Sequence, residues 1–486
     1  MISAPLITEM SVQANPAALA PKISHAALLV TSQVVKWSLR LVFVVIVARA
    51  LGPQQFGVYA LLFALIEFLA VASGSGYADY LTREAAKDAR VGWGLAFQLV
   101  WLRVAVAIPV AAIEIGILSV MRYPRPVLAG TTWMALSLIP RSLSEAVQGV
   151  LRGIHQYVSY LVIEIVLGGG LVAGAGLLFL RRGGLGIVIV TEVVAAAAAS
   201  LAALVFGLKY KTREAIWLKG SQLIKTSGVF NAYSFIASLY DRFDVVLLSK
   251  LAGDYATGIY SVAYRALGMT QIVAYGVLYS LLPALSRSAG SVKERRRLEK
   301  AMGLLLSAAF FVVLATMAFA GPAVRLLLGA QYAESADALK ILIWAVVLRY
   351  INYALNIALL AAGRERVFVR TSLVCLAVNF IGNLVFIPMY SWRAAAVLTI
   401  ATELVLLGQN LYWIRRTAGE VAVPWGMART SLVFVALSGI SFAGGYFGLP
   451  LVLGSACLVT FAGYLYGSGM IMEFATAWGA ERIPAD

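Results

Sequence analysis

Apolar stretches of about 20 residues recur along the whole chain, and this recurrence limits what the chain can fold into. Of its 486 residues, 61% are hydrophobic and 13% charged, whereas soluble domains are close to half apolar and a quarter charged. In lipid the backbone must satisfy its own hydrogen bonds, so a stretch of this length crosses the membrane as a helix. We therefore predict an all-α polytopic membrane protein with about 14 transmembrane helices. The predicted spans are 25–47, 56–78, 93–119, 127–150, 157–180, 184–208, 228–249, 258–282, 300–320, 336–361, 368–388, 392–414, 430–447 and 450–472.

A short motif occurs twice, each time directly after a long apolar stretch. It reads ARALGPQQFGVYALL at residues 48–62 and SKLAGDYATGIYSV at residues 249–262, at a shift of 201. Both copies hold a basic residue, two glycines and a tyrosine at the same spacing: Arg49, Gly52, Gly57 and Tyr59, then Lys250, Gly253, Gly258 and Tyr260. The glycines permit tight backbone and close helix approach. The cation can anchor a helix end, and the tyrosine suits the membrane interface.

Further landmarks repeat in the same order. Polar residues spaced i, i+3, i+4, i+7 form one helical face in the fourth span and again in the tenth, at a shift of 208. They are Arg141, Ser144, Glu145 and Gln148, then Arg349, Asn352, Tyr353 and Asn356. A Thr-Glu pair at 191–192 returns at 402–403. Each repeat holds six spans, an even number, so both repeats start on the same side. The sequence thus predicts two parallel six-helix lobes plus a C-terminal helix pair.

Lysine and arginine are concentrated in alternate loops. Counted together with the span-end residues Lys300, Arg370 and Arg393, the loops after even-numbered spans hold 21 of them and the loops after odd-numbered spans hold 8. By the positive-inside rule both termini are predicted to be cytoplasmic, and the net charge of +16 needs no nucleic acid to explain it. The predicted units are a cytoplasmic tail at 1–24, an N-terminal lobe at 25–208, a cytoplasmic linker with an interfacial helix at 209–227, a C-terminal lobe at 228–416, and the helix pair with a cytoplasmic tail at 417–486.

Eight further basic residues fall inside apolar spans, where a charge at mid-bilayer costs at least about 2.5–3.5 kcal/mol on insertion scales. They are Lys36, Arg40, Arg103, Arg141, Arg242, Arg265, Lys340 and Arg349. Such residues usually face a bundle interior or a watery cavity. For any single one, a structural ion pair or a snorkelling end residue is an equally good interpretation. Lys36 and Arg40 lie four residues apart and repel each other, so an anion or acidic partners are expected opposite. The set as a whole favours a hydrated, partly cationic cavity between the lobes.

Acidic residues also lie in the spans, and some are expected to neutralise the cations. They are Glu67, Glu114, Glu145, Glu164, Glu192, Asp241, Asp244 and Glu403. We expect Arg141 to pair with Glu145 within one helix, and Asp241 with Arg265 across neighbouring helices. The residues predicted to bind a substrate are Lys36, Arg40, Arg141, Arg242, Arg265, Arg349, Gln148, Asn352 and Asn356. The residues predicted as candidates for ion coupling are Glu67, Asp241 and Asp244.

Motifs for enzyme chemistry are missing from the sequence. It contains no Gly-Lys dipeptide and so no phosphate-binding loop of the ATPase type, no His-x-x-x-His pair and no Cys-x-x-Cys pair. Cys375 and Cys457 lie in apolar spans and are interpreted as small core residues. We therefore expect no catalytic site, no cofactor and no bound metal.

Three segments carry a family resemblance. The first is ARALGPQQFGVYAL followed by SGSGYADYLTR, the second is DRFDVVLLSKLAGDYATGIYSVAYRALGM, and the third is LYSLLPALSR. Together they resemble the MOP superfamily of multidrug, oligosaccharidyl-lipid and polysaccharide exporters, and within it the Wzx-type polysaccharide transporters. The resemblance covers the first twelve spans. It implies two six-helix lobes around a cationic central cavity, which rock between inward-open and outward-open forms.

The resemblance also implies a flippase that moves polyprenyl-pyrophosphate-linked oligosaccharide to the outer leaflet, for exopolysaccharide or O-antigen-type synthesis. The expected location is the bacterial inner membrane, and the expected partners are the lipid-linked oligosaccharide, membrane lipids, a polysaccharide polymerase and glycosyltransferases. In this hypothesis the pyrophosphate lies near Lys36, Arg40, Arg242 and Arg265. The sugars contact the polar side chains of the fourth and tenth spans, and the lipid tail stays in the bilayer through a lateral gap between the lobes.

Three alternatives stay open at this point. An ion-coupled multidrug antiporter of the same fold would favour an acidic, aromatic cavity for cationic drugs. A membrane-embedded polysaccharide polymerase or ligase typically carries a large outward loop with catalytic arginines, and no outward loop here is long. A scaffold that recruits partners without transport would leave the intramembrane cations unexplained.

Overall fold

The computed structural model describes residues 22–74, 76–181, 183–210, 220–287, 292–361, 364–418, 427–446 and 450–468. Within these ranges the chain is helical and contains no strand, which confirms the predicted all-α class. The predicted N-terminal tail up to residue 21, residues 211–219 of the predicted linker and the C-terminal tail after residue 468 lie outside the described residues.

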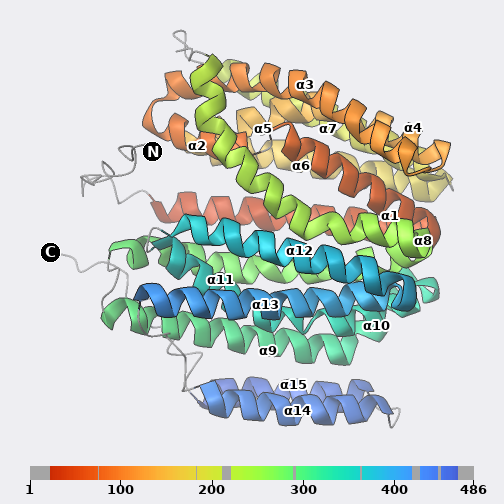
Figure 1. The fold of residues 1–486 in the computed structure, drawn as a ribbon, viewed down its shortest axis with the longest axis vertical. Helices are drawn as coiled ribbons and strands as arrows, with labels where there is room; N and C mark the ends of the chain where they lie inside the picture. Colours follow the sequence, from red (N-terminus) through yellow and green to blue (C-terminus); the bar gives the residue numbers. More distant parts are fainter. Residues whose placement is uncertain are drawn as a thin grey trace.

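The helices form two lobes and a separate pair (Figure 1). The N-terminal lobe holds α1 (Lys22–Ala72), α2 (Tyr77–Lys87), α3 (Ala89–Val120), α4 (Arg125–Ala135), α5 (Leu138–Gly153), α6 (Tyr157–Arg181) and α7 (Leu185–Tyr210). The C-terminal lobe holds α8 (Gly220–Arg287), α9 (Val292–Leu328), the 3-10 turn η2 (Ala330–Tyr332), α10 (Ala333–Leu342), α11 (Ala345–Ala361), α12 (Glu365–Tyr390) and α13 (Trp392–Ala418). The pair is α14 (Ala428–Tyr446) and α15 (Pro450–Gly467). The predicted two lobes and helix pair are thus confirmed.

Seven of the described helices are individually long and apolar enough to cross a membrane, and α10 with α11, bent by 44°, makes an eighth span. In this total of eight, α1 counts as one span, although it contains two of the predicted spans, joined at a kink. At the kink Gly52 has φ 73°, and α8 has the same kink at Gly253 with φ 85°. Only glycine adopts this left-handed region without strain, so the first glycine of the repeated motif turns the helix in each lobe. We call the end of the molecule that holds both kinks the kink end; it lies on the right in Figure 1.

Two local features differ from the predicted spans. The fourth and tenth spans are each broken, into α4 and α5 and into α10 and α11. A predicted loop after the second span contains the short amphipathic helix α2, whose YADYLTREAAK sequence has a helical apolar period. Asp88 then begins α3 by accepting a hydrogen bond from the Arg90 backbone N–H at 2.8 Å. Hydrogen bonds from Arg90 lower the pKa of the Asp88 carboxyl, because they favour its ionised form.

A continuous apolar core joins the lobes along α1, α8 and α9, and a second cluster fills the N-terminal lobe between α2, α3, α5 and α7. The helix pair packs on α9, where the rings of Phe310 and Phe434 stack with centroids 4.1 Å apart. Cys375 and Cys457 are buried and free, as predicted for small core residues.

Candidate functional site

The two kinks interlock at the boundary between the lobes. A Cβ atom added to Gly57 of α1 would lie 1.7 Å from the carbonyl oxygen of Asp254 in α8. A Cβ atom added to Gly258 of α8 would lie 2.0 Å from the carbonyl oxygen of Pro53 in α1. Each contact is the counterpart of the other under the shift of 201 residues. The second glycine of the motif therefore allows the backbones of the two lobes to touch.

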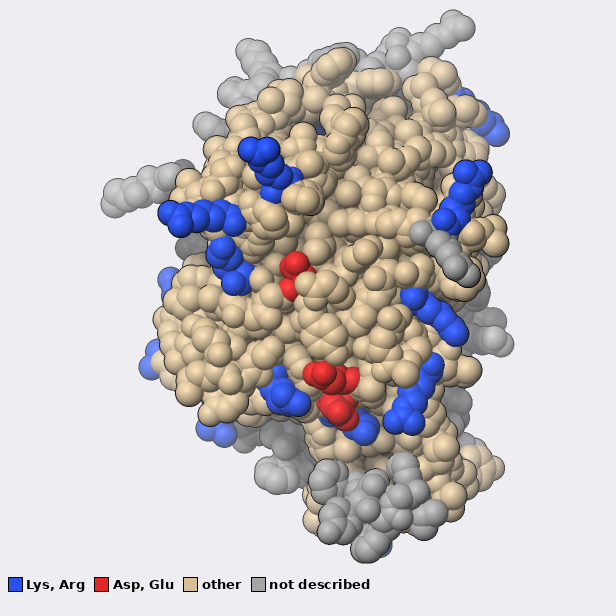
Figure 2. All heavy atoms as spheres, turned by 90° about the vertical axis from the view of Figure 1, so that its right-hand side faces the viewer, with Lys and Arg blue, Asp and Glu red and all other residues tan. Residues whose placement is uncertain are grey.

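Hydrogen bonds reinforce this contact from both sides. Arg49 of α1 donates to the Leu326 carbonyl of α9 at 3.1 Å, and Lys250 of α8 donates to the Met121 carbonyl at the end of α3. The Tyr332 hydroxyl also donates to a carbonyl of α1, at 2.9 Å. The motif cations thus each anchor the end of a helix in the opposite lobe. Figure 2 looks onto the kink end, where the surface between the lobes is closed and basic side chains lie around the rim.

Three arginines from both lobes gather around one aromatic ring behind this contact. The guanidinium carbons of Arg40, Arg242 and Arg265 lie 4.7, 5.1 and 5.3 Å from the centroid of Phe63. Arg40 and Phe63 belong to α1, whereas Arg242 and Arg265 come from the two halves of α8. Cation–π contact holds such groups in place without neutralising them. We call these three arginines and Phe63 the Phe63 cluster.

Among the described residues, only one arginine of the Phe63 cluster has an acidic ion-pair partner. Arg40 lies 3.2 Å from a carboxylate oxygen of Glu192. Arg242 and Arg265 form no ion pair with any residue that the structure describes, and Nη1 of Arg265 is buried without a hydrogen-bond partner. The predicted pair between Asp241 and Arg265 is therefore wrong: Arg265 instead lies 5.0 Å from the Phe56 ring and 5.2 Å from the Tyr59 ring.

The other intramembrane cations of the N-terminal lobe are paired. Lys36 lies 3.2 Å from Glu164, which also accepts a hydrogen bond from Gln148 at 3.3 Å. Arg141 lies 2.9 Å from Glu67 and 3.6 Å from Glu145. The predicted pair within one helix is thus confirmed, although Glu67 is the closer partner.

Glu145 also accepts a hydrogen bond from Arg103, so a chain of alternating charges runs inward from α3. It passes through Glu145 and Arg141 and ends at Glu67. Outside the Phe63 cluster, Lys36, Arg103, Arg141 and Arg349 thus each have an acidic partner. The positive charge is therefore a local property of the Phe63 cluster rather than of the whole lobe boundary.

The predicted residues of the tenth span lie inside the C-terminal lobe. Arg349 forms an ion pair with Glu403 at 2.7 Å, and both side chains are about 5% exposed or less. Asn352 donates to the same carboxylate at 3.0 Å and accepts a hydrogen bond from Asn410 at 3.3 Å. The Oδ1 atom of Asn356 is buried without a partner. This network holds three helices of one lobe together, away from the Phe63 cluster.

The two motif tyrosines do not lie at the membrane interface, so that prediction is wrong. Tyr59 and Tyr260 are both 0% exposed. Tyr59 donates to Glu192 at 2.8 Å, and Tyr260 donates to Asp244. A buried tyrosine hydroxyl needs a polar partner, and an acid inside each lobe provides it. Sequence reasoning also missed Phe63, although aromatic residues within reach of intramembrane arginines were a signal that could have been used.

The side of the Phe63 cluster away from the kink end is accessible to solvent. The Lys36 side chain is 45% exposed and that of Arg40 is 27% exposed. Asp241 is also exposed, whereas Asp244 one turn later is buried. From residue 31 to residue 42 the α1 side chains are mostly exposed or half-buried, whereas most of those from residue 43 to the kink are buried in the core. The lobes are closed at the kink end and accessible from the other end.

This geometry suits an anion with several oxygens. Two guanidinium groups without acidic partners offer planar pairs of donors, which match phosphate better than a point charge does. The described residues contain no group of three or more His, Cys, Asp or Glu side chains that could hold a metal ion. A ligand here would therefore be recognised by arginine and by aromatic surface.

Two parallel six-helix lobes that meet at a charged boundary define a polytopic membrane protein, and solved structures share this fold. A multidrug resistance MATE family transporter of the MOP superfamily, in its inward-facing conformation, matches with a TM-score of 0.65 at 14% identity, covering 79% of this chain and 94% of that chain. The lipid II flippase MurJ, in an inward closed conformation, matches with a TM-score of 0.64 at 11% identity, covering 92% of this chain and 99% of that chain.

The sequence places the chain within a family. It belongs to the polysaccharide biosynthesis protein family, whose model matches residues 24–289. The MatE family model matches residues 232–385. A curated relative, the probable low-salt glycan biosynthesis flippase Agl15 of Haloferax volcanii, is 22% identical over 439 residues, covering 86% of this chain and 88% of the relative.

Proposed function

We propose that this protein is a flippase that moves oligosaccharide carried on polyprenyl pyrophosphate from the cytoplasmic to the outer leaflet by alternating access. The observation that carries the proposal is the Phe63 cluster, in which Arg242 and Arg265 lie at the lobe boundary without an acidic partner among the described residues. A diphosphate would satisfy both groups at once. The family match and the glycan flippase named among the relatives support this class of substrate.

The charge pattern supports an orientation. Because the loops at the kink end carry fewer basic residues, the positive-inside rule assigns the kink end to the outer side of the membrane. The accessible side of the Phe63 cluster would then face the cytoplasm, where the substrate is loaded. Under this assignment the structure is an inward-facing state, and both termini are cytoplasmic. A location in the bacterial inner membrane remains a prediction.

The path of each part of the substrate follows from the same arrangement. The diphosphate binds at Arg40, Arg242 and Arg265, and Lys36 with its partner Glu164 lies one helical turn nearer the cytoplasm. Gln148 supplies an amide close to Lys36 that can hydrogen-bond a sugar. The polar network around Arg349, Asn352 and Asn356 lies inside the C-terminal lobe. These residues would contact the substrate only if the network opened during transport.

The membrane potential can drive part of the movement. Each elementary charge that crosses the field is worth about 2.3 kcal/mol per 100 mV. A diphosphate with roughly two charges would gain about 4–5 kcal/mol when it moves outward from a negative interior. Asp241, Asp244 and Glu67 are proposed as ion-coupling groups, because acids at the lobe boundary can bind a proton or sodium when the lobes part.

Reconstitution tests the proposal. Purified protein in sealed vesicles would be given polyprenyl-pyrophosphate-linked oligosaccharide, and its movement between leaflets would be measured. Replacing one charged hydrogen-bond donor costs about 1.5–3 kcal/mol, so Arg242→Gln and Arg265→Gln should each slow translocation roughly 10- to 100-fold. Arg416→Gln is a matched control, because Arg416 is an exposed cation at the end of α13. Translocation that stays at the wild-type rate in both cluster variants would refute the proposal.

An ion-coupled multidrug antiporter is the second candidate, because the MatE family model also matches residues 232–385. The same vesicles distinguish it: an antiporter would move a cationic dye in exchange for protons or sodium. The unpaired cations of the Phe63 cluster disfavour a cationic substrate.

A further inference from the structure

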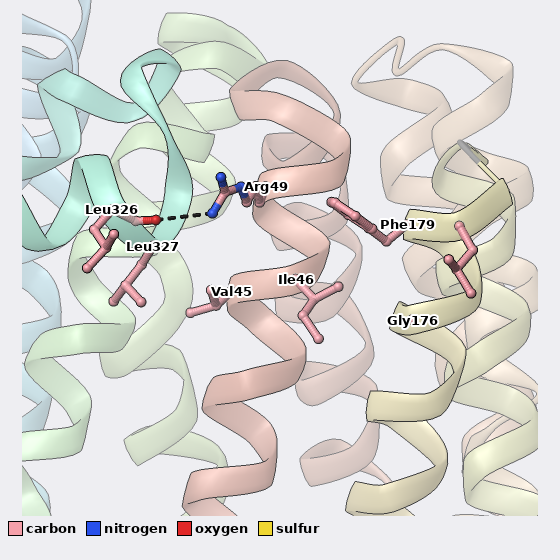
Figure 3. A pocket seen from close by; sticks show the side chains of 8 residues that line it. Val45, Ile46, Arg49, Gly176, Phe179, Leu326 and Leu327 are labelled. Carbon is pink, nitrogen blue, oxygen red and sulfur yellow. Dashed lines mark hydrogen bonds between the residues drawn. The ribbon is translucent and has the colours of Figure 1, made fainter.

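An apolar groove lies on the side of the molecule near the kink end, between α1, α6 and α9. Its volume is about 480 Å³, within the range of about 300–1,000 Å³ typical of small-molecule sites. Its walls are Val45 and Ile46 from α1, Phe179 and Leu180 from α6, and Leu326 and Leu327 from α9. Figure 3 shows Phe179 pointing from α6 toward α1, with Arg49 at the head of the groove. Hydrocarbon is the chemistry that these walls accept.

One arginine lines this groove, and two more are sequence neighbours of residues that line it. Arg49 lines it, Arg181 directly follows Leu180, and Arg325 directly precedes Leu326. All three are exposed, and none forms an ion pair with a residue inside the described ranges. Arg49 is held in place by its hydrogen bond to the Leu326 carbonyl. Basic residues above an apolar surface at the membrane interface attract anionic lipid headgroups.

We infer that this groove binds one acyl chain of an anionic phospholipid from the leaflet at the kink end, with the lipid phosphate against Arg49. The apolar walls select the chain, and the unpaired arginines select an anionic headgroup over a zwitterionic one. This inference does not depend on the transported substrate, because the groove lies on the outside of the lobe boundary and the Phe63 cluster lies behind the interlocked kinks.

The groove also joins the two lobes. Its walls on α1 and α6 belong to the N-terminal lobe, whereas its wall on α9 belongs to the C-terminal lobe. A bound chain contacts both lobes only while the kink end is closed. A ligand that binds one conformation shifts the population toward it, so anionic lipid stabilises the closed kink end and slows its opening.

Photo-crosslinking in vesicles tests the inference. The full chain would be reconstituted with phosphatidylglycerol or phosphatidylcholine that carries a photoreactive acyl chain, and the labelled peptides would be mapped. Phosphatidylglycerol should label the peptides around Ile46, Phe179 and Leu327 in preference to phosphatidylcholine. One basic residue near the surface contributes about a fivefold effect, so Arg49→Gln should reduce that preference by about fivefold.

A pair of glycine variants supplies the control. A Cβ atom on Gly176 meets nothing within 4 Å, so Gly176→Leu fills the groove without disturbing α6 and should abolish the labelling. Gly169, on the same helix and outside the groove, has equal room, so Gly169→Leu should keep it. Equal labelling by both lipids, or labelling that survives Gly176→Leu, would overturn the inference. Preferential labelling by a photoreactive polyprenyl phosphate instead would assign the groove to the transported lipid and would also overturn it.

Discussion

Each lobe contains a polar network at an equivalent position of the repeat. The two networks differ because one of them holds a basic residue where the other holds an acidic residue. Arg40 in the N-terminal lobe corresponds to Asp241 in the C-terminal lobe under the shift of 201 residues. Arg40 forms an ion pair with Glu192. Glu403 occupies the position equivalent to Glu192, and it forms an ion pair with Arg349 instead. The first network is partly exposed at the lobe boundary, and the second is closed inside its lobe. The repeated scaffold thus holds one partly exposed polar network and one closed network at equivalent positions.

The aromatic positions show the same division. Phe63 corresponds to Tyr264. Phe63 contacts three guanidinium groups, two of them from the other lobe, whereas Tyr264 contacts Arg349 of its own lobe at 5.6 Å and accepts its hydrogen bond at 3.2 Å. The N-terminal lobe therefore provides the surface on which cations of both lobes meet.

The largest expected effect is on the closed network. Arg349→Gln leaves Glu403 buried without a cation, and breaking a buried pair costs about 3–5 kcal/mol. Thermal unfolding in detergent should show this loss, and the equivalent Arg141→Gln should cost clearly less because its partners are 21% and 26% exposed. Equal losses in the two lobes would contradict the division between them.

The second-largest effect is expected at the contact between the two kinks, where the lobes meet. Gly258→Ala would place a methyl group 2.0 Å from the Pro53 carbonyl, and overpacking of this kind costs about 1–3 kcal/mol. The added methyl group destabilises only the conformation in which the kink end is closed. Distances between spin labels placed across that end should therefore shift toward those of an open conformation. Gly268→Ala on the same helix meets nothing within 4 Å and should leave the distances unchanged. A closed distance distribution in Gly258→Ala would show that the glycine contact does not limit closure.

A smaller effect is expected at the motif tyrosines. Tyr260→Phe removes the hydroxyl that donates to buried Asp244, and an unsatisfied buried acceptor costs about 1–3 kcal/mol. Tyr59→Phe should cost less, because Glu192 keeps its pair with Arg40. Chemical or thermal unfolding of the two single variants measures the difference, and the reverse order would indicate that the networks are not divided in this way.

The smallest effect on stability is expected at Asp241. It is exposed and forms no ion pair within the described part of the chain, so Asp241→Asn should change stability by no more than about 0.5 kcal/mol. If Asp241 couples transport to an ion, the same variant should remove the acceleration of translocation by a proton or sodium gradient. An acceleration as large as in wild type would exclude Asp241 from coupling.

Much of the fold was predictable, because apolar length and the internal repeat are properties of the sequence alone. The spans, the two lobes and the pairing of Arg141 with Glu145 followed from periodicity. The partner of Arg265 did not, because sequence places Asp241 and Arg265 on neighbouring helices without giving the rotation of either helix. The sequence favours the membrane interface for Tyr59 and Tyr260 because tyrosine suits that position, and the kinks that turn them inward appear only in the backbone.

The most direct test of the central claim is the binding of a sugar-free lipid to the purified protein. Polyprenyl pyrophosphate and the corresponding polyprenol would be titrated against wild type and against a variant that carries both Arg242→Gln and Arg265→Gln, with Arg416→Gln as the control. If the Phe63 cluster holds the diphosphate, the double variant should bind the pyrophosphate roughly 100-fold or more weakly and bind the polyprenol as wild type does. Wild-type affinity for the pyrophosphate in the double variant would contradict the account.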